Sequence, residues 1–467
     1  MVRPTFLDTI PAASILCLSL ILPWALFAQT NEEPINSNDS CSKYVSEKRP
    51  SQLLFSHKPK KDQLARADRL FSQAIVITAH DHCYSVHDFA DMNAGGITAR
   101  TIKLATDNVW WDAGVTKFWP PPLTTKDNYK AQESDFSQFG RDAIAMARDI
   151  RGIRIVQSVS DIYDAKRTGR LGVIVSFEGG AVAKPGEIST PADRRCWAEV
   201  QHDKCMDSIG NLATKWGLRE FQPYWVTDNF LKKNGSGDWQ TASLNSYGTA
   251  VLKTLKDLGV LVDLSHMGPA PFDQAVDILG PTTPFIISHT SVAAVSFCER
   301  EKPDCDNYRN WTFAEIFGPR GGTFSLDEQT IETIRKHNAV IALHFMEHIL
   351  SAERFSKKQD ITVVDLVNEI DYLHRKHMIE NVALGPDYYP ADERERGNVT
   401  WAEGLRDMTE LKNVAIEMIV RESERYSDEE IMDVLGLNLV RLYCRVWKSS
   451  PSVDQCHQLL DGRLTGN

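Results

Sequence analysis

Several strand-like segments of this 467-residue chain end on a residue whose side chain can bind a metal ion. Residues this far apart in sequence come together only where parallel strands deliver their carboxyl ends to one point, as at the mouth of a (β/α)8 barrel. No other feature of the sequence constrains the fold as strongly. The five strand ends carry His80 and His82, Glu178, His266, His289 and Asp387.

Eight short runs of apolar or β-branched residues supply enough strands for such a barrel. Most are apolar throughout rather than alternating, which is typical of strands buried on both faces. The sequence therefore predicts an α/β fold, a (β/α)8 TIM barrel with extended loops on its carboxyl-terminal face. The predicted strands are Ala74–His82, Gly114–Trp119, Leu171–Glu178, Phe221–Val226, Val260–His266, Pro284–His289, Ala339–Phe345 and Asn381–Asp387.

The segments between these strands carry apolar residues three and four positions apart, as amphipathic helices do. Gly259 follows one of them, where a left-handed helix cap is expected. Strands that alternate with helices indicate a parallel α/β fold. The predicted helices are Phe139–Ile150, Tyr247–Leu258, Phe272–Leu279, Asp327–His337 and Ile361–His377.

The sequence has no Ser/Gly-rich linker, repeat or low-complexity stretch at which to divide it. We therefore expect one barrel domain over residues 68–450, enlarged by long loops. A signal peptide (1–28) and an amino-terminal extension (29–67) precede it, and a short tail (451–467) follows. Long loops after several strands should crowd the barrel mouth. These loops are Pro120–Ser137, Ala181–Gly210, Cys298–Ser325 and Pro390–Gly404.

The amino terminus contains an apolar run, Ile10–Phe27, that ends before a polar stretch and is typical of a signal peptide cleaved near Ala28. An uncleaved anchor is the alternative, but Pro11 and Pro23 weigh against a spanning helix. We expect an exported protein, periplasmic or secreted, without stable membrane insertion. The net charge of -11 and the pI of about 5.7 argue against nucleic acid as a partner.

Cysteine usage agrees with export. Eight cysteines remain after the leader, and three close couples could form disulfide bonds in an oxidising compartment. Buried free thiols are the alternative for any one couple. The couples are Cys196 with Cys205, Cys298 with Cys305 and Cys444 with Cys456.

The first candidate ligands lie on predicted strands one and three. His80 and His82 are two positions apart in a strand, so their imidazoles project from the same face and can hold one ion. Glu178 ends an apolar strand before two glycines, and its carboxylate could bridge two ions. A solvated or salt-bridged glutamate is the alternative reading.

The remaining candidates repeat this design on later strands. His266 and His289 each follow a serine at the end of an apolar strand. A single histidine there is more often structural than a metal ligand, but two in consecutive strands favour binding. Asp387 ends the eighth strand; a turn aspartate is the alternative.

Five motifs, "AHDHC", "FEGG", "DLSHM", "ISHTS" and "LGPDYY", resemble in order those of the membrane dipeptidase (renal dipeptidase) family of binuclear zinc hydrolases. The resemblance runs from about Phe71 to Trp447. It implies two Zn²⁺ per chain, with Glu178 shared between them. The implied ligands are His80, His82, Glu178 and Asp387 for one ion, and Glu178, His266 and His289 for the other.

The resemblance also implies a chemistry, the hydrolysis of a dipeptide amide bond by a metal-bridging hydroxide. Asp387 would take the proton of the water and return it to the leaving amine, while Glu178 bridges the ions. The expected partners are a small peptide or amide substrate and at most a second copy of the chain in a homodimer.

The chain departs from the family at three places. His82 stands where the family usually has Asp. Trp225 stands where the family has a substrate-binding His, and His344 could supply an imidazole from the opposite side of the mouth, although a structural role is the alternative. Arg309, or else Arg300, would bind the substrate carboxylate. These changes leave two other functions open: a related amidohydrolase acting on N-acyl amino acids or lactams, and a metal-binding pseudoenzyme.

Overall fold

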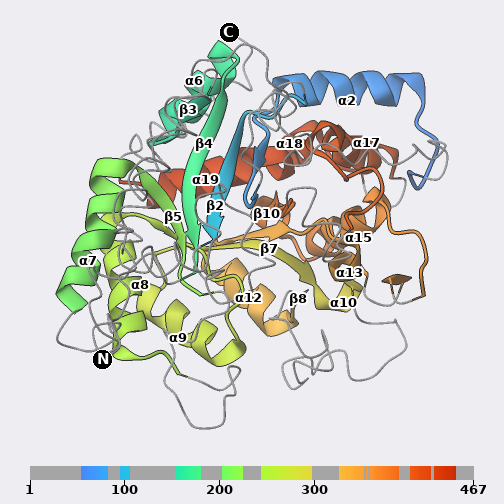
Figure 1. The fold of residues 1–467 in the computed structure, drawn as a ribbon. Coiled ribbons are helices and arrows are strands. Elements are labelled where there is room, and N and C mark those ends of the chain that lie inside the picture. Colours follow the sequence, from blue (N-terminus) through green and yellow to red (C-terminus); the bar gives the residue numbers. More distant parts are fainter. Residues whose placement is uncertain are drawn as a thin grey trace, which may run out of the picture.

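The computed structural model describes residues 54–82, 95–105, 153–179, 202–224, 243–296, 325–351, 354–355, 357–388, 400–421 and 425–448. Within these ranges, parallel strands follow one another around a barrel in their order along the chain (Figure 1). The predicted (β/α)8 fold is confirmed. The barrel strands are β1 (Ile77–Thr78), β2 (Ala99–Ala105), β4 (Leu171–Glu178), β5 (Leu218–Gln222), β6 (Leu261–Val262), β7 (Ile286–Val292), β9 (Val340–Leu343) and β10 (Val382–Leu384).

The barrel closes unevenly. The last strand, β10, lies parallel to β1, with Leu384 opposite Thr78. Between β6 and β7 the backbone pairing is thinner, because it consists of an isolated parallel bridge from Asp263 to Ile286 and a hydrogen bond of 2.9 Å that Leu264 N donates to Ile286 O, while side chains add further hydrogen bonds across the junction. We call this junction the β6–β7 seam.

The third barrel strand, β4, shows why apolar runs in the sequence predicted strands correctly. All eight residues of β4 are buried, and the strand has the predicted bounds, Leu171–Glu178. Helices cover the outer face of such a strand and side chains fill the barrel inside, so neither face is polar. Two short strands were not predicted. They are β3 (Ile153–Ile155), which pairs with β4, and β8 (Ser325–Leu326), which pairs with β7.

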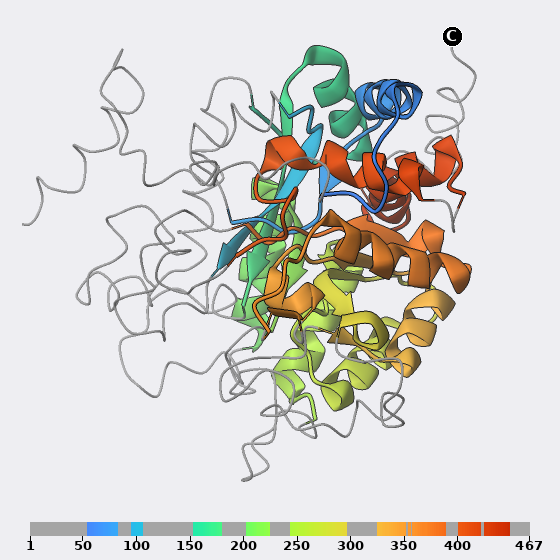
Figure 2. The same cartoon turned by 90° about the vertical axis from the view of Figure 1, so that its right-hand side faces the viewer.

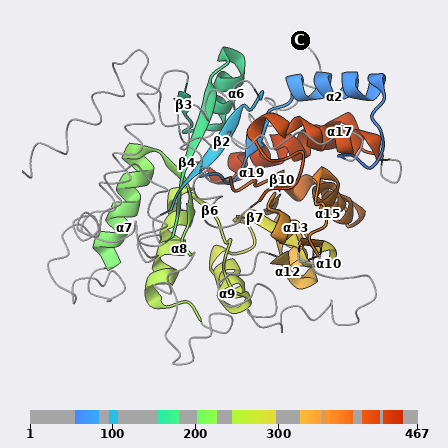
Figure 3. The same ribbon diagram turned by 45° about the vertical axis from the view of Figure 1, so that its right-hand side comes forward.

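The helices lie outside the strands (Figure 3). In α8 the Asn245 side chain accepts a hydrogen bond from Gly248 N, and the helix ends at Gly259, whose φ of 69° gives the predicted left-handed cap. The other predicted helices within the described residues also form. The longer helices are α6 (Val159–Thr168), α7 (His202–Asn211), α8 (Ser246–Leu258), α9 (Pro269–Leu279), α12 (Glu328–Lys336), α15 (Val363–Arg375), α17 (Lys412–Val420) and α19 (Asn438–Val446), and the shorter ones are α10 (Ala293–Ser296), α13 (Glu347–Leu350) and α18 (Asp428–Met432).

The position of the second barrel strand was predicted wrongly. It is β2, Ala99–Ala105, and not Gly114–Trp119, which lies outside the described residues. The sequence of β2, "ARTIKLA", does not look like a buried strand because it carries Arg100 and Lys103. Both side chains are nevertheless fully buried. Lys103 finds two carboxylates inside the barrel, a compensation that the local sequence does not reveal.

Both ends of the described chain pack on the barrel. The helix α2 (Lys61–Gln73) lies along α17 and α18 (Figures 1 and 2), and Arg66 forms an ion pair of 2.6 Å with Asp428. Helix α2 runs without a break across residues 67 and 68, where the sequence analysis placed the start of the barrel domain. At the other end, Leu439 and Tyr443 of α19 join the cluster of buried side chains that includes Ile77 and Ile286 of the barrel strands.

Several predictions concern residues outside the described ranges and stay predictions: the signal peptide, the helix Phe139–Ile150 and most of the long loops. Cys444 is disulfide-bonded, but its partner is not among the described side chains, so its pairing with Cys456 also stays a prediction. None of the helices in the described ranges is both long and apolar enough to cross a membrane.

Candidate metal centre

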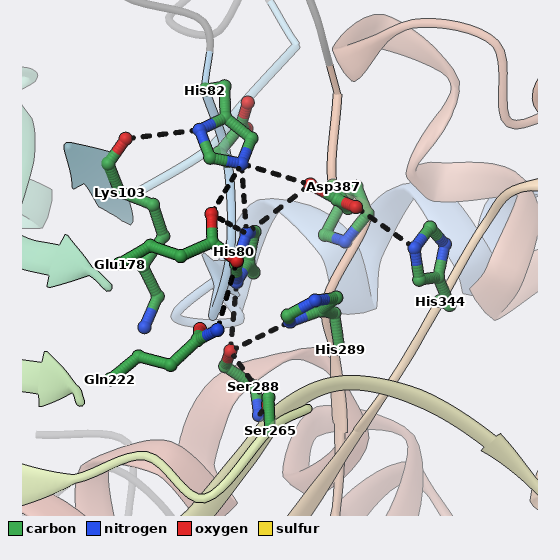
Figure 4. Close-up of polar contacts among 12 residues, drawn as sticks. His80, His82, Lys103, Glu178, Gln222, Ser265, Ser288, His289, His344 and Asp387 are labelled. Carbon is green, nitrogen blue, oxygen red and sulfur yellow. Dashed lines mark hydrogen bonds and ion pairs between the residues drawn. The ribbon is translucent and has the colours of Figure 1, made fainter. Parts of the chain in front are cut away.

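The barrel brings the predicted metal ligands together at the carboxyl-terminal ends of its strands, and Figure 4 labels all of them except His266. Their side chains are at most 6% exposed. They therefore form one buried polar cluster at the mouth of the barrel. The ligands are His80 and His82 after β1, Glu178 at the end of β4, His266 after β6, His289 within β7 and Asp387 after β10.

The first ligand group surrounds the two histidines that follow β1. His80 Nε2 and His82 Nε2 lie 3.1 Å apart, as the two-residue spacing predicted. Asp387 Oδ1 lies 3.3 Å from each of these nitrogens. Glu178 Oε2 lies 3.2 Å from His82 Nε2 and 3.8 Å from His80 Nε2. Two nitrogens and two carboxylate oxygens thus converge on one point.

The second ligand group shares Glu178 with the first. His266 Nε2 and His289 Nε2 lie 2.7 Å apart, and Glu178 Oε1 lies 3.4 Å from His266 Nε2. The two oxygens of Glu178 therefore face different pairs of imidazoles. This arrangement suits a carboxylate that bridges two cations.

The residues fit a pair of metal ions. Groups that could each hold an ion are His80, His82 and Glu178 on one side and Glu178, His266 and His289 on the other. Imidazole nitrogen and carboxylate oxygen together are typical ligands of zinc. Asp263 also comes within reach of His80 and His289, but Lys103 Nζ lies 2.6 Å from its Oδ2, so we assign it a supporting role.

Two of the ligands have a backbone conformation that side chains usually avoid. His266 has a φ of 63° and Asp387 a φ of 56°, both in the left-handed region. Each such residue costs about 1 kcal/mol or more, and such strain is concentrated at functional sites. The backbone just before Asp387 packs closely against β7. A Cβ on Gly385 would lie 2.0 Å from the carbonyl oxygen of Ser288, so only glycine fits there.

Strand β7 is irregular where it carries its ligand. Its pairing with β9 shifts register between Ile287 and Thr290. Consecutive side chains of a regular strand point to opposite faces, and an irregularity of this kind re-aims them. Ser288 and His289 are consecutive, yet the Ser288 Oγ lies 2.9 Å from His80 Nδ1 and 3.1 Å from His289 Nδ1.

Burial and neighbouring charges act differently on the two histidines after β1. Burial lowers the pKa of His80 to about 4, which Asp387 and Glu178 offset only in part. Burial also lowers the pKa of His82, but Asp387 and Glu178 outweigh it and raise that pKa to about 10. The pKa values of Glu178 and Asp387 are raised by burial but held well below their ordinary values by the surrounding histidines. Both carboxylates therefore stay ionised and attract cations.

Further residues of the site were not predicted from the sequence. Gln222 is the last residue of β5, and its Nε2 donates to Glu178 Oε1 at 2.9 Å and to Tyr224 O at 3.2 Å. Lys103 and Ser288 support the histidines. Gln222 is only the second residue of the predicted strand Phe221–Val226, so its place at a strand end was not foreseen, and the signal for Lys103 would have been a cation inside a β-branched run.

His344 lies at the mouth, as predicted, but contacts the protein rather than facing open space. The backbone N–H of Met346 donates to its Nδ1 at 3.0 Å, so the imidazole proton is on Nε2, which donates to Asp387 Oδ2 at 3.0 Å. Both ring nitrogens have partners, and His344 holds Asp387. Trp225, Arg300 and Arg309 lie outside the described residues, and their roles in substrate binding stay predictions.

Two candidate ligand groups that share one glutamate at the carboxyl-terminal mouth of a parallel barrel are typical of a metallohydrolase of barrel fold. The sequence specifies which one: residues 64–306 and 320–456 match the model of the membrane dipeptidase family (peptidase family M19). The chain belongs to this family of metallo-dipeptidases, hydrolases that act on peptide bonds, as the motifs predicted.

Individual relatives are distant. The chain is 20% identical over 400 residues to dipeptidase verJ of Clonostachys rogersoniana, covering 82% of this chain and 86% of the relative. Among solved structures it is similar to the probable dipeptidase PvdM of Pseudomonas aeruginosa, with a TM-score of 0.55, 16% identity and coverage of 83% and 99% of the two chains. A Rhodobacter sphaeroides metallo peptidase, liganded with a phosphinate mimic of the dipeptide L-Ala-D-Ala, has a TM-score of 0.53 at 16% identity, covering 80% of this chain and 100% of that one. These structures share the fold.

Proposed function

We propose that this chain is an exported dipeptidase that uses two zinc ions at the barrel mouth. The observation that carries the proposal is the position of Glu178, whose Oε2 lies 3.2 Å from His82 Nε2 and whose Oε1 lies 3.4 Å from His266 Nε2. One carboxylate between two pairs of imidazoles is what a bridged pair of ions requires. The ligands would be His80, His82, Glu178 and Asp387 for one ion, and Glu178, His266 and His289 for the other.

Ions held by these residues would supply Lewis-acid activation of the scissile carbonyl and of a water molecule near neutral pH. The protein groups would orient the reactants and move the proton. Asp387 is suited to accept the proton of the attacking water, since its Oδ1 faces the first ligand group and its low pKa keeps it ionised. It would then return the proton to the leaving amine.

The proposed substrate is a dipeptide. Membership of the dipeptidase family supports this class, and the dipeptide mimic bound by the Rhodobacter sphaeroides enzyme supports a D-residue at the carboxyl-terminal position. In this proposal Arg309 binds the substrate carboxylate and Trp225 contacts the substrate. Because the chain departs from the family at these positions, the side chains that its substrate carries are to be determined with a panel of dipeptides.

A substrate panel tests the function. Zinc-loaded protein would be assayed with dipeptides that have L- or D-residues at the carboxyl-terminal position, with N-acyl amino acids and with lactams. We expect hydrolysis of dipeptides only. Turnover of only the acylated amino acids or lactams would replace the proposal with the related amidohydrolase, and metal-loaded protein inert toward the whole panel would indicate a pseudoenzyme.

Metal analysis tests the two-ion site independently of activity. We expect two ions per reconstituted chain and selective loss of one in His266→Ala, because His266 contacts only the second ligand group. Elemental analysis of the dialysed proteins measures this. A wild-type chain that retains one ion or none would contradict the binuclear site.

Export is proposed from the apolar run Ile10–Phe27 followed by a polar stretch. Expression of the full chain in a host with a secretory pathway should give a mature protein that begins near residue 29. Intact-mass measurement of the recovered protein would show it. A cell-associated product with the leader retained would instead indicate the uncleaved anchor.

A further inference from the structure

We propose that Lys103, Asp263 and Ser288 form a buried chain that fixes the tautomers of His80, His82 and His289, so that each presents its Nε2 lone pair to the metal site. The proposal rests on the metal-binding role assigned above to these histidines. It gives a role to an ion pair inside the barrel that the hydrolytic scheme leaves unexplained. Figure 4 shows Lys103 and Ser288 beside the ligands.

The Ser288 hydroxyl has a single proton to donate. Ser288 Oγ donates that proton to Asp263 Oδ2, in a short hydrogen bond. It then has only lone pairs to offer to its two imidazole neighbours, His80 Nδ1 at 2.9 Å and His289 Nδ1 at 3.1 Å. Both Nδ1 atoms must therefore carry a proton and donate. One hydroxyl thus leaves Nε2 unprotonated in one histidine of each ligand group.

Asp263 keeps the Ser288 hydroxyl in this orientation as long as it is ionised. Its Oδ1 accepts hydrogen bonds from Ser265 N at 3.0 Å and Ser265 Oγ at 2.6 Å, and its Oδ2 faces Lys103 Nζ at 2.6 Å. Burial raises the pKa of Asp263, but Lys103 and the serine hydroxyls outweigh burial and hold the pKa below its ordinary value. An ionised carboxylate can only accept, so the Ser288 proton must point toward it.

Lys103 also acts on the third histidine directly. His82 Nδ1 lies 3.1 Å from the Lys103 carbonyl oxygen, which can only accept a hydrogen bond. The Nδ1 of His82 therefore carries a proton, and its Nε2 faces His80 Nε2 and the carboxylates. Lys103 thus fixes the tautomer of His82 through its backbone carbonyl. Through its side chain and Asp263 it fixes the tautomers of His80 and His289. Hydrogen bonds that orient metal-binding histidines typically change metal affinity about 10–100-fold when they are removed.

The second carboxylate beside Lys103 supplies a matched control. Glu220 Oε1 lies 2.6 Å from Lys103 Nζ, as close as Asp263 Oδ2 does, but the serine that donates to it is Ser176 and not Ser288. Glu220→Gln leaves Asp263 paired with Lys103. Lys103→Met leaves two buried carboxylates without a cation, which favours uptake of a proton. A protonated Asp263 would donate to Ser288, whose own proton could then turn toward a histidine.

The test compares two pairs of variants by zinc affinity in a chelator competition. Lys103→Met is paired with Glu220→Gln, since each breaks the same buried ion pair. Ser288→Ala is paired with Ser176→Ala, since each removes a buried hydroxyl that donates to a carboxylate paired with Lys103. We expect the affinity to fall about 10-fold or more in Lys103→Met and Ser288→Ala, and to stay within about twofold in the other two.

If the ion pair only stabilises the fold, both variants of each matched pair should be less stable than the wild type. Their zinc affinity should then be unchanged. Unchanged affinity in Ser288→Ala, or equal losses within a pair, would overturn the proposal. Should Lys103→Met not fold, the serine pair decides alone. Nitrogen-15 NMR of histidine-labelled, metal-free protein separates this proposal from the function: His80 and His289 should be protonated at Nδ1 in the wild type, and at least one should change in Ser288→Ala, whether or not zinc binds.

Discussion

Asp387 uses its two carboxylate oxygens for different neighbours. Oδ1 lies 3.3 Å from both His80 Nε2 and His82 Nε2, while Oδ2 accepts a hydrogen bond from His344. A group that moves a proton acts in the transition state, so Asp387→Asn should lower kcat by about 10²-fold or more. Steady-state kinetics together with metal analysis would measure this. Near-normal kcat in a variant that retains both ions would place the base elsewhere.

His344 should act through Asp387. Loss of its donated hydrogen bond raises the pKa of the Asp387 carboxylate, so His344→Ala should lower kcat about 10-fold, leave KM nearly unchanged and move the acid limb of the kcat profile to higher pH. A pH profile of kcat checks this. His374→Ala is the control, since that histidine bonds to Glu430 on α18, remote from the ligands. A fall in kcat/KM with an unmoved acid limb would instead support the role considered from the sequence, in which His344 supplies an imidazole in place of the family's substrate-binding histidine.

At this scale the sequence predicted that the candidate ligands lie together, but not which groups surround them. Their clustering was predictable because each ends an apolar run, and parallel strands bring such ends together. Lys103, Gln222 and Ser288 were missed, because their partners lie on other strands and no local pattern shows them. The left-handed backbone at His266 and Asp387 also depends on tertiary packing rather than on local propensity.

At the scale of elements, strand β2 explains the main error in the predicted fold. A buried strand with a charged interior residue becomes acceptable only when other strands supply counter-charges, here Glu220 of β5 and Asp263 after β6. By contrast, β4 was predicted at its observed bounds because all of its residues are buried. Hydrophobic pattern therefore predicts strands with apolar interiors and misses those that carry the polar interior of the site.

Glu220 should make stability depend on pH. Burial raises its pKa from 4.5 to about 7, although Lys103 opposes the shift. Between these values the folded chain holds a proton that the unfolded chain has lost, so the free energy of unfolding falls as pH rises through this window. Relative to Glu220→Gln, the wild type should lose stability between about pH 4.5 and pH 7.

Urea denaturation of both proteins at several pH values, under identical metal conditions, measures this difference. Acid release of metal affects the two proteins alike and cancels in the comparison. Parallel stability curves across the window would show that Glu220 stays ionised in the folded chain.

For the whole molecule, the β6–β7 seam is the thinnest junction of the barrel, and the second ligand group spans it. His266 follows β6 and His289 lies in β7. An ion bound by both would join the two sides, and ligands that bind only the folded state stabilise it. Metal removal should therefore speed amide hydrogen exchange in residues 261–267 and 286–292 more than in 171–178. Hydrogen-exchange mass spectrometry of metal-loaded and metal-free protein tests this, and a uniform change along the chain would contradict it.

The same arrangement determines how the chain could be divided. An exposed turn, Pro281–Thr282, separates α9 from β7. A break there would leave His266 in one fragment and His289 and Asp387 in the other, and neither fragment would carry a full ligand set for either ion. Co-expressed halves would then assemble a complete centre only together. The barrel is thus a natural starting point for a split reporter whose reassembly depends on the bound metal.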